Sequence, residues 1–184
     1  NLISNNNADY NFLGISLDAS SNNVIEKNVG RFNGFGVIHV GGSSKNNIIR
    51  NNIANENDDD GIVLSYRSTS GVPTNNIVEN NEANANFDAG IELVNADFNT
   101  IQNNVASNNG IWGIWLKDPS NDLKNEGNII KFNTLYSNAV IDIQLDSPSL
   151  NAGNILEGNK NGFTTLSSTP QTIALWIAPI TVIS

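Results

Sequence analysis

One short pattern, Asn-x-(Ile/Val/Leu)-x-x-Asn, recurs seven times along the chain and constrains its fold more than any other feature. Its first Asn stands at positions 1, 23, 47, 76, 99, 128 and 154, so successive copies are 22, 24, 29, 23, 29 and 26 residues apart. A repeat of this length is typical of a solenoid, in which each coil stacks on its neighbours to share one elongated core. We therefore expect about seven coils of 22–29 residues.

Each coil contains two segments in which apolar and variable residues alternate, the mark of half-buried strands. The first is the Asn motif, whose central apolar residue we expect to face inwards: Ile3, Ile25, Ile49, Val78, Ile101 and Ile130. The second follows a Gly, as in Gly61-Ile62-Val63-Leu64, and its expected outward positions are Ser16, Val63, Glu92, Trp115 and Gln144. Since a coil leaves no room for a helix, each strand should pair in parallel with its counterpart one coil away, at a rise of roughly 4.8 Å.

Asn makes up 36 of the 184 residues and returns at fixed places. A third Asn follows ten residues after the first, at Asn11, Asn33, Asn57, Asn86, Asn109 and Asn138. Stacked Asn amides can donate to and accept from the Asn one coil away, which forms a ladder along the axis. Asn also tolerates the left-handed backbone conformation of sharp corners. The Asn columns are therefore expected to hold the fold rather than to perform chemistry.

The Asn-x-Ile-x-x-Asn and Gly-Ile-x-Leu units resemble those of the right-handed parallel β-helix repeat proteins. The resemblance is to the short-repeat group that includes NosD-type copper-maturation proteins and carbohydrate-binding and sugar-hydrolase-associated domains. It implies an all-β, right-handed single-stranded parallel β-helix, pectate-lyase-like in architecture, with Asn ladders. Mannuronan C5-epimerases and several polysaccharide lyases share this architecture, but a fold does not determine a function.

Composition excludes several classes of partner. Nine basic against 18 acidic residues give a net charge of −9, which argues against nucleic acid. The chain has no Cys, and no run of about 20 apolar residues predicts a membrane span. Because the sequence starts in mid-pattern without Met, we interpret it as a processed or trimmed piece. We expect an extracellular or cell-surface protein exported by a bacterium.

The coils longer than the minimum carry insertions at residues 65–75, 117–127 and 147–153, each after a Gly-Ile-x-Leu strand or its equivalent. They should emerge along one edge of the rod, and loops stacked on one side of a solenoid commonly form its binding face. We expect the repeats to cover residues 1–163. Residues 164–184 form an apolar tail that either caps the last coil or, through 171–184, contacts another subunit or domain.

Candidate glycan-binding residues gather near the second insertion: Asp88, Glu92, Trp112, Trp115 and Lys117. Aromatic faces stack on the apolar faces of pyranose rings, and acids and amides bind the hydroxyls. The alternative is that one Trp packs into the corner beneath a neighbouring loop.

The run Asp58-Asp59-Asp60 suggests a calcium site, because hard cations take several carboxylate oxygens. Three consecutive side chains on a strand cannot all converge, however, so an exposed acidic turn is the preferred interpretation. The sequence requires no cofactor, and Ca²⁺ is the one metal that it suggests.

His39, Tyr66 and Arg67 are the candidate catalytic residues. His39 aligns with Leu17, Leu64 and Leu93, an inward column, which predicts a neutral His in the core. If the flanking residues turn inwards instead, His39 is exposed and can act as a general base.

We favour a non-catalytic, rigid scaffold that binds polysaccharide through its loop edge. One alternative is a polysaccharide lyase or C5-epimerase acting on an acidic glycan, although the Asp-Pro-His cluster of the epimerases is absent. Another is a structural subunit of a surface or appendage assembly.

Overall fold

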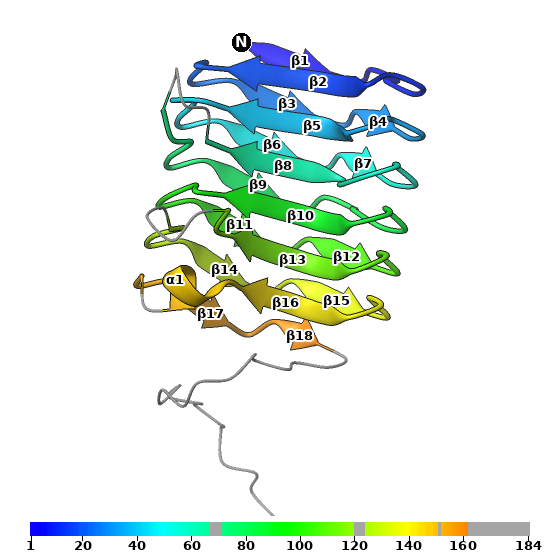
Figure 1. Cartoon of the computed structure of the whole chain (residues 1–184). Coiled ribbons are helices and arrows are strands. Elements are labelled where there is room, and N and C mark those ends of the chain that lie inside the picture. Colours follow the sequence, from blue (N-terminus) through cyan, green and yellow to red (C-terminus); the bar gives the residue numbers. More distant parts are fainter. Residues whose placement is uncertain (67–70, 120–123, 151, 162–184) are drawn as a thin grey trace, which may run out of the picture.

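The structure, a computed structural model, describes residues 1–66, 71–119, 124–150 and 152–161. Over these residues the chain winds into a right-handed parallel β-helix of seven coils, which confirms the predicted fold class (Figure 1). The expected repeat region is thus described as far as residue 161. The tail at 164–184, including the proposed contact at 171–184, lies outside the described residues.

Two long parallel sheets form two sides of the coil. The seven-stranded sheet contains one strand from each Asn motif: β1 (Leu2–Ser4), β3 (Val24–Glu26), β6 (Ile48–Arg50), β9 (Ile77–Glu79), β11 (Thr100–Gln102), β14 (Ile129–Lys131) and β17 (Ile155–Glu157). The six-stranded sheet contains the strands with the second alternation: β2 (Leu13–Asp18), β5 (Gly36–Gly41), β8 (Ile62–Ser65), β10 (Ala89–Val94), β13 (Trp112–Lys117) and β16 (Ile141–Leu145). Each strand pairs with its counterpart one coil away, as predicted.

A third side is built from shorter strands. It contains the pair β4 (Val29–Gly30) and β7 (Ile53–Ala54) and the trio β12 (Val105–Ser107), β15 (Thr134–Tyr136) and β18 (Lys160–Asn161). Single bridges from Glu82 to Ile53 and to Val105 join the two groups into one continuous side. One short helix, α1 (Ser147–Leu150), follows β16.

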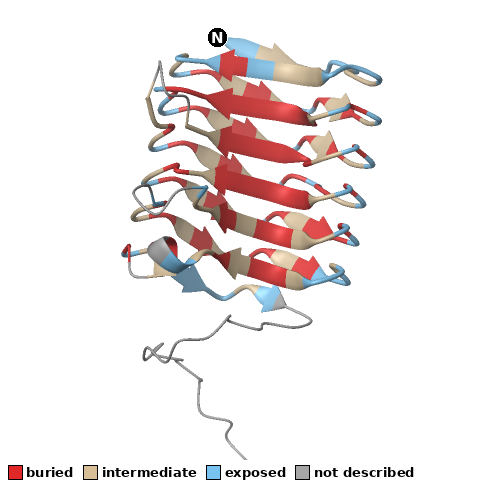
Figure 2. Ribbon diagram, in the orientation of Figure 1, coloured by how far each residue is buried: buried red, intermediate tan, exposed pale blue. Residues whose placement is uncertain are grey.

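Stacked aliphatic side chains fill the inside of the coil. Ile25, Ile49, Val78, Ile101 and Ile130 from the seven-stranded sheet are fully buried, as the motif predicts. They pack in one cluster with the inward residues of the six-stranded sheet, such as Ile62, Leu64, Ile91 and Leu93. Figure 2 shows that burial is most complete in the middle coils, since the end coils have a neighbour on one side only.

Three Asn ladders run along the axis. In each, Nδ2 of one Asn donates to Oδ1 of the Asn one coil further on, as between Asn76 and Asn99 at 3.0 Å and between Asn81 and Asn104 at 3.0 Å. The third column behaves in the same way, with Asn57 Nδ2 2.7 Å from Asn86 Oδ1. The same Oδ1 also accepts the backbone N–H of the preceding Asn. The predicted ladders are therefore confirmed, and each amide oxygen receives two donors.

The left-handed corners lie one residue before the ladders, not at them. Residues with φ near +56° include Asn80, Asn103 and Phe132, which precede the ladder residues Asn81, Asn104 and Asn133. Lys27, Glu56, Ala85 and Ser137 hold equivalent places, so residues of many types occupy this conformation. The expectation that the column Asn themselves adopt it is wrong. Their side chains are fixed by the ladder, and the residue before each makes the turn.

The insertions leave the coil at one edge. They begin at the carboxyl ends of β8, β13 and β16, which are neighbours in one parallel sheet or one strand apart. The described ends of these segments and α1 lie together on the left of Figure 1. This edge borders the outward face of the six-stranded sheet, where the candidate residues lie.

Candidate functional site on the outward face of the six-stranded sheet

The outward face of the six-stranded sheet presents a column of one residue per coil. Strand register places Ser16, His39, Val63, Glu92, Trp115 and Gln144 side by side in that order. The five residues predicted to face outward do so. The structure adds His39 to the same outward column. Its prediction as a member of the inward Leu column is wrong, because Val40 pairs with Leu17 and Leu64 instead.

The middle of this column points away from the core and is nevertheless covered. Val63 is 1% exposed, and His39 and Glu92 are each 3% exposed, although none of the three belongs to the core cluster. The face over β5, β8 and β10 is therefore a second packed layer. Functional side chains here are held in place rather than free in solvent.

Two Trp side chains lie against each other, with tilted rings, beside this layer. The ring centroids of Trp112 and Trp115 lie 3.6 Å apart at an angle of 33°. Trp115 Nε1 donates to Asp146 Oδ1 at 3.0 Å, and Lys117 Nζ lies 4.3 Å from the centroid of the same ring. Trp115 is thus fixed by three contacts within the protein. The Trp112 side chain makes no hydrogen bond that involves its indole N–H among the described residues, and both Trp side chains are partly buried.

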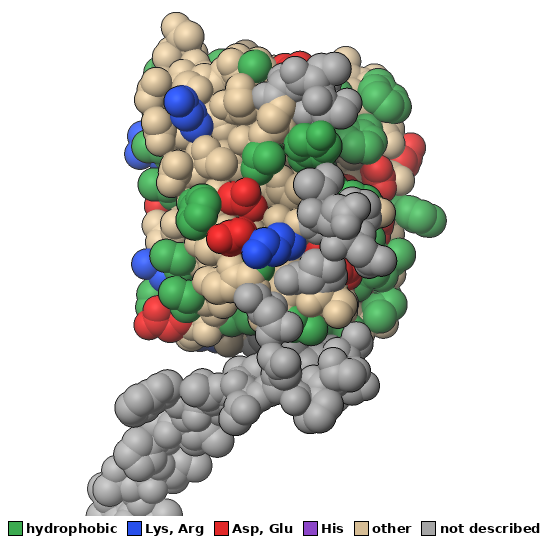
Figure 3. Space-filling view, turned by 60° about the vertical axis from the view of Figure 1, so that its left-hand side comes forward, with side chains coloured by type: hydrophobic (Ala, Val, Ile, Leu, Met, Phe, Trp, Pro, Cys, Tyr) green, Lys and Arg blue, Asp and Glu red, His purple; other side chains and the backbone are tan. Residues whose placement is uncertain are grey.

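Lys117 connects the aromatic pair to the carboxylates. Its Nζ donates to Glu92 Oε1 at 2.8 Å, and Glu92 is almost completely buried. The five predicted glycan-binding residues therefore lie together on β10, β13 and the turn before β10. Figure 3, which brings the insertion edge forward, shows acidic and basic side chains side by side with hydrophobic ones near them.

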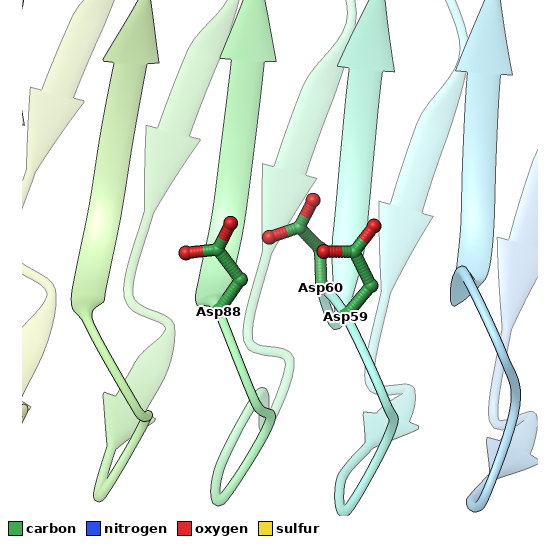
Figure 4. Close-up of side chains that lie close together, drawn as sticks. All are labelled: Asp59, Asp60 and Asp88. Carbon is green, nitrogen blue, oxygen red and sulfur yellow. The ribbon is translucent and has the colours of Figure 1, made fainter.

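Three carboxylates converge from two successive coils. One oxygen each of Asp59, Asp60 and Asp88 lies within 4.8 Å of the others, and Figure 4 shows the three side chains close together on two adjacent coils. Asp58 is exposed and does not belong to this group. The expectation that the three consecutive side chains cannot all converge is confirmed, because Asp58 lies outside the group. The preferred interpretation as an exposed acidic turn is wrong for Asp60, which is 2% exposed and accepts the Ala89 N–H at 2.9 Å.

Burial and mutual repulsion raise the pKa of these carboxyl groups. Burial and the neighbouring Glu92 raise the pKa of Asp60 well above its ordinary value, while the Ala89 hydrogen bond opposes the shift. Burial also raises the pKa of Glu92, although the hydrogen bonds from Lys117 and Asp60 oppose this. Burial and their closeness to one another thus favour the neutral form of the Asp60–Glu92 carboxyl pair over two charged carboxylates.

The remaining charges follow from the same geometry. Burial alone would lower the pKa of Lys117, but its bond to Glu92 and the nearby Asp60 and Asp88 raise it, so the ammonium stays charged. Burial and the Asp59 charge raise the pKa of Asp88. Asp88 Oδ1 is buried and has no hydrogen-bond partner among the described residues.

The three candidate catalytic residues are only partly described. His39 Nε2 lies 2.6 Å from Ser65 Oγ, and the His39 ring meets Phe35 edge-on at 6.0 Å. Tyr66 is the next residue after Ser65 and is partly buried, and its N–H donates to Val94. Arg67 lies outside the described residues.

Sequence reasoning missed the residues that organise the edge of this face. Asp146 accepts the Trp115 indole N–H and the Asp118 backbone N–H. Asp118 in turn binds the Ser149 hydroxyl and backbone N–H and the Asn125 amide, which ties the second insertion to α1. Ser65 was missed as well. The aligned strand ends contained the signal, because Ser65, Lys117 and Asp146 occupy the same position after the Gly-Ile-x-Leu unit or its equivalent.

No helix in the described part of the chain is both long and apolar enough to cross a membrane.

Several solved structures share this fold. The periplasmic alginate epimerase AlgG superposes with a TM-score of 0.73 at 24% identity, over 88% of this chain and 39% of AlgG. The A-module of the Azotobacter vinelandii mannuronan C-5 epimerase AlgE6 gives a TM-score of 0.68 at 18% identity, over 92% of this chain and 58% of the module. The matched region therefore spans less than two thirds of either protein. No curated protein sequence matches it.

The sequence also matches, over residues 1–160, the model of the family described as periplasmic copper-binding protein (NosD). Copper sites in proteins use thiolate, thioether or imidazole ligands. This chain has no Cys, no Met and a single His, whose Nε2 is already in contact with Ser65. The residues present do not fit copper, and the carboxylate group of Asp59, Asp60 and Asp88 is of the kind that harder cations prefer.

The family match extends over the whole described β-helix, from the first Asn motif to the last. The motifs that carry the match are those that build the ladders and the two long sheets. The chain belongs to the NosD family of parallel β-helix proteins.

Proposed function

We propose that this chain is an exported β-helix module that binds polysaccharide on the outward face of its six-stranded sheet. The observation that carries the proposal is the assembly of Trp112 and Trp115 with Lys117, Glu92 and Asp88 on adjacent coils. An aromatic platform beside charged hydrogen-bonding groups is the usual composition of a sugar-binding surface.

The contacts of the two Trp residues support different proposed tasks for them. Asp146, Lys117 and Trp112 all contact Trp115, which makes it a support for the platform. Trp112 lies next to Asp88, whose backbone oxygen accepts the Trp112 N–H at 3.3 Å. A sugar ring stacked on Trp112 would therefore place its hydroxyls near the Asp88 carboxylate, whose buried Oδ1 has no partner in the described structure.

The charge of the site bears on the class of polysaccharide. Four carboxyl groups, from Asp59, Asp60, Asp88 and Glu92, surround Lys117, which Glu92 already neutralises. A neutral glycan can use these groups directly as acceptors. An acidic glycan would need a divalent cation to join its carboxylates to those of Asp59 and Asp88, and calcium suits such oxygen ligands.

Location follows the same proposal. The matching family and AlgG are both described as periplasmic, and the polysaccharides that such a surface would meet lie outside the cytoplasm. We place this module in the periplasm or at the cell surface.

Binding is tested on an array of neutral and acidic polysaccharides, followed by calorimetry with and without calcium. Trp112→Ala should weaken binding about tenfold, because an aromatic contact contributes roughly 0.5–1.5 kcal/mol beyond its buried area. Tyr136→Ala is the matched control, since Tyr136 is an exposed aromatic residue on the third side of the coil.

Equal affinity of the wild type and Trp112→Ala for every glycan bound would overturn the proposed surface. For the cation, Asp88→Asn should remove any calcium dependence of binding, whereas Asp58→Asn, outside the carboxylate group, should leave it intact.

A second candidate is C5-epimerisation or β-elimination of an acidic glycan. The outward position of His39 favours it, because this potential general base lies on the same face as the proposed glycan-binding surface. AlgG and AlgE6 are named as epimerases acting on alginate or mannuronan. The test incubates the protein with alginate and pectate in D₂O, with and without calcium. The absence of both an unsaturated product and deuterium at C5 would dismiss this candidate.

A further inference from the structure

Ser65 and His39 form a hydroxyl–imidazole pair that the proposed binding surface does not use. Ser65 Oγ and His39 Nε2 are 2.6 Å apart, well within hydrogen-bond distance. With the ring proton on Nδ1, Nε2 accepts the hydroxyl proton of Ser65. This is the arrangement by which a general base activates a serine as a nucleophile.

Strand register holds the pair in this geometry. Ser65 pairs with Gly41 on β5, and His39 pairs with Val63 on β8, so the two side chains are diagonal neighbours on one face. His39 is 3% exposed, and the Phe35 ring contacts its edge. Ser65 is partly exposed. The base is thus shielded from water while the hydroxyl stays within reach of a ligand.

The pair lies close to the proposed glycan platform. Ser65 and Lys117 belong to the same outward column, with Val94 between them. Two strand spacings separate them, about 10 Å along the axis. A polysaccharide that lies on the Trp112 platform and follows the sheet would therefore pass the Ser65 hydroxyl.

We propose that Ser65 is the nucleophile of a hydrolytic site for esters, with His39 as its general base, and that its substrates are O-acylated, chiefly O-acetylated, polysaccharides. The identity of the natural substrate rests on the proposed function, whereas the chemistry at Ser65 does not. The acyl carbonyl carbon forms a bond to Ser65 Oγ while the hydroxyl proton moves to His39 Nε2. The bond from that carbon to the sugar oxygen then breaks, and the sugar oxygen takes the proton.

Water completes the cycle in the same way. It gives a proton to His39 and attacks the acyl-serine, the bond to Ser65 Oγ breaks, and the serine regains its proton. The products are a carboxylic acid and a free sugar hydroxyl, and no oxidant, reductant or cofactor takes part.

The test uses 4-nitrophenyl acetate as a small ester, and a fluorophosphonate as a covalent probe of activated serine. We expect hydrolysis faster than in buffer and labelling of Ser65 detected by peptide mass spectrometry. Ser65→Ala should abolish both, and His39→Gln should reduce the rate about 100-fold or more, as for loss of a general base. Ser16→Ala is the matched control, because Ser16 pairs with His39 from the other side on β2 and is exposed.

His39 is buried, so circular dichroism melting of each variant separates loss of chemistry from loss of fold. Hydrolysis by the wild type no faster than by a folded Ser65→Ala variant, or labelling at another residue, overturns the proposal. Trp112→Ala should slow acetate release from acetylated polysaccharide, whereas Tyr136→Ala, on the third side of the coil, should leave that rate unchanged. Hydrolysis of 4-nitrophenyl acetate requires no glycan. Loss of the glycan-binding proposal would therefore not affect the proposal of ester hydrolysis at Ser65. Absence of ester hydrolysis would likewise not affect the glycan-binding proposal.

Discussion

Replacing one central ladder residue should cost more stability than most single substitutions. Asn81 takes part in four side-chain hydrogen bonds. Its Nδ2 donates to Asn104 Oδ1 and to the Ile49 carbonyl, at 3.0 and 2.9 Å. Its Oδ1 accepts the backbone N–H and Nδ2 of Asn52, both at 2.9 Å. Asn81→Ala removes all four and keeps the backbone N–H bond to Asn104.

The magnitude follows from what the lost partners can do instead. Asn52 and Asn104 are each 1% exposed, so water cannot replace the missing amide. A buried hydrogen bond contributes about 1 kcal/mol net, and a buried group left unsatisfied costs about 1–3 kcal/mol. The four bonds therefore predict a loss of about 4 kcal/mol in the free energy of unfolding, at the high end for a point mutation.

Urea unfolding followed by far-ultraviolet circular dichroism measures this loss, and the slope of the transition shows whether the array still unfolds as one unit. Asn6→Ala is the control from the same ladder. Asn6 is exposed on the first coil, and its side chain makes two bonds, to Asn28 and to the Ser4 carbonyl. Its loss should stay below about 1 kcal/mol, because Asn28 Oδ1 keeps the Asn6 backbone N–H as a donor and the bond to the Ser4 carbonyl is exposed to water. Equal losses in the two variants would refute the view that buried ladder amides stabilise the coil.

Three other substitutions test the site and the corners. Asp60→Asn should raise the melting temperature at pH 7. The pKa of Asp60 is raised on folding, so its contribution to stability is present below about pH 3.8 and is lost as the pH rises towards the folded value; the gain should therefore shrink in acid. Lys117→Met should destabilise the protein by about 1–3 kcal/mol at neutral pH, because the buried Glu92 carboxylate loses its cationic donor. The loss should be smaller where Glu92 is protonated, as thermal melts at several pH values would show. Gly127→Ala should lower the free energy of unfolding, measured in urea, more than Gly153→Ala does. Both glycines have positive φ, so both substitutions strain the backbone. An added Cβ at Gly127 would also lie 2.5 Å from the Phe98 ring, whereas one at Gly153 would meet nothing within 4 Å.

The frame of this molecule could be predicted from sequence because its residues repeat. Each ladder Asn and each inward Ile appears once per coil, so one interpretation is checked several times along the chain. The left-handed corners were misplaced for the opposite reason. Asn80, Phe132 and Glu56 adopt the same φ near +56° and share no chemistry, so residue type does not mark these corners; only their place before a ladder Asn does.

The site was harder to predict because it depends on single residues and on register. Two steps separate Asn11 from Leu13 in the first coil, whereas three separate Asn33 from Gly36 in the second, and the structure pairs Leu13 with Gly36. Aligning the glycines instead shifts the strand by one residue, and such a shift moves every side chain to the opposite face. This one residue accounts for the wrong placement of His39.

The acidic group illustrates the same point across coils. Asp88 joins Asp59 because its N–H donates to the Asp59 carbonyl one coil away, at 3.0 Å. Aligning Asp59-Asp60-Gly61 with Asp88-Ala89-Gly90 predicts that Asp59 and Asp88 are neighbours on adjacent coils. The run Asp58-Asp59-Asp60 suggests a site made of sequence neighbours instead. Burial of Asp60 depends on packing that the sequence does not display.

The ladders also explain how this fold can vary its outer face without losing its frame. Val40 pairs with Leu64 at an interval of 24 residues, and Ile48 pairs with Ile77 at an interval of 29. The segment between residues 64 and 77 thus absorbs five extra residues, while the Asn47–Asn76 bonds keep the coils in register beyond it. Since the columns stay aligned, a substitution on the outward face acts mainly on residues one coil away. Lys117 reaches Glu92, Trp115 reaches Asp146, and Ser65 reaches His39 in this manner. New chemistry in such a protein therefore arises from pairs of residues about one coil apart in sequence, and the alignment of coils is where it should be sought.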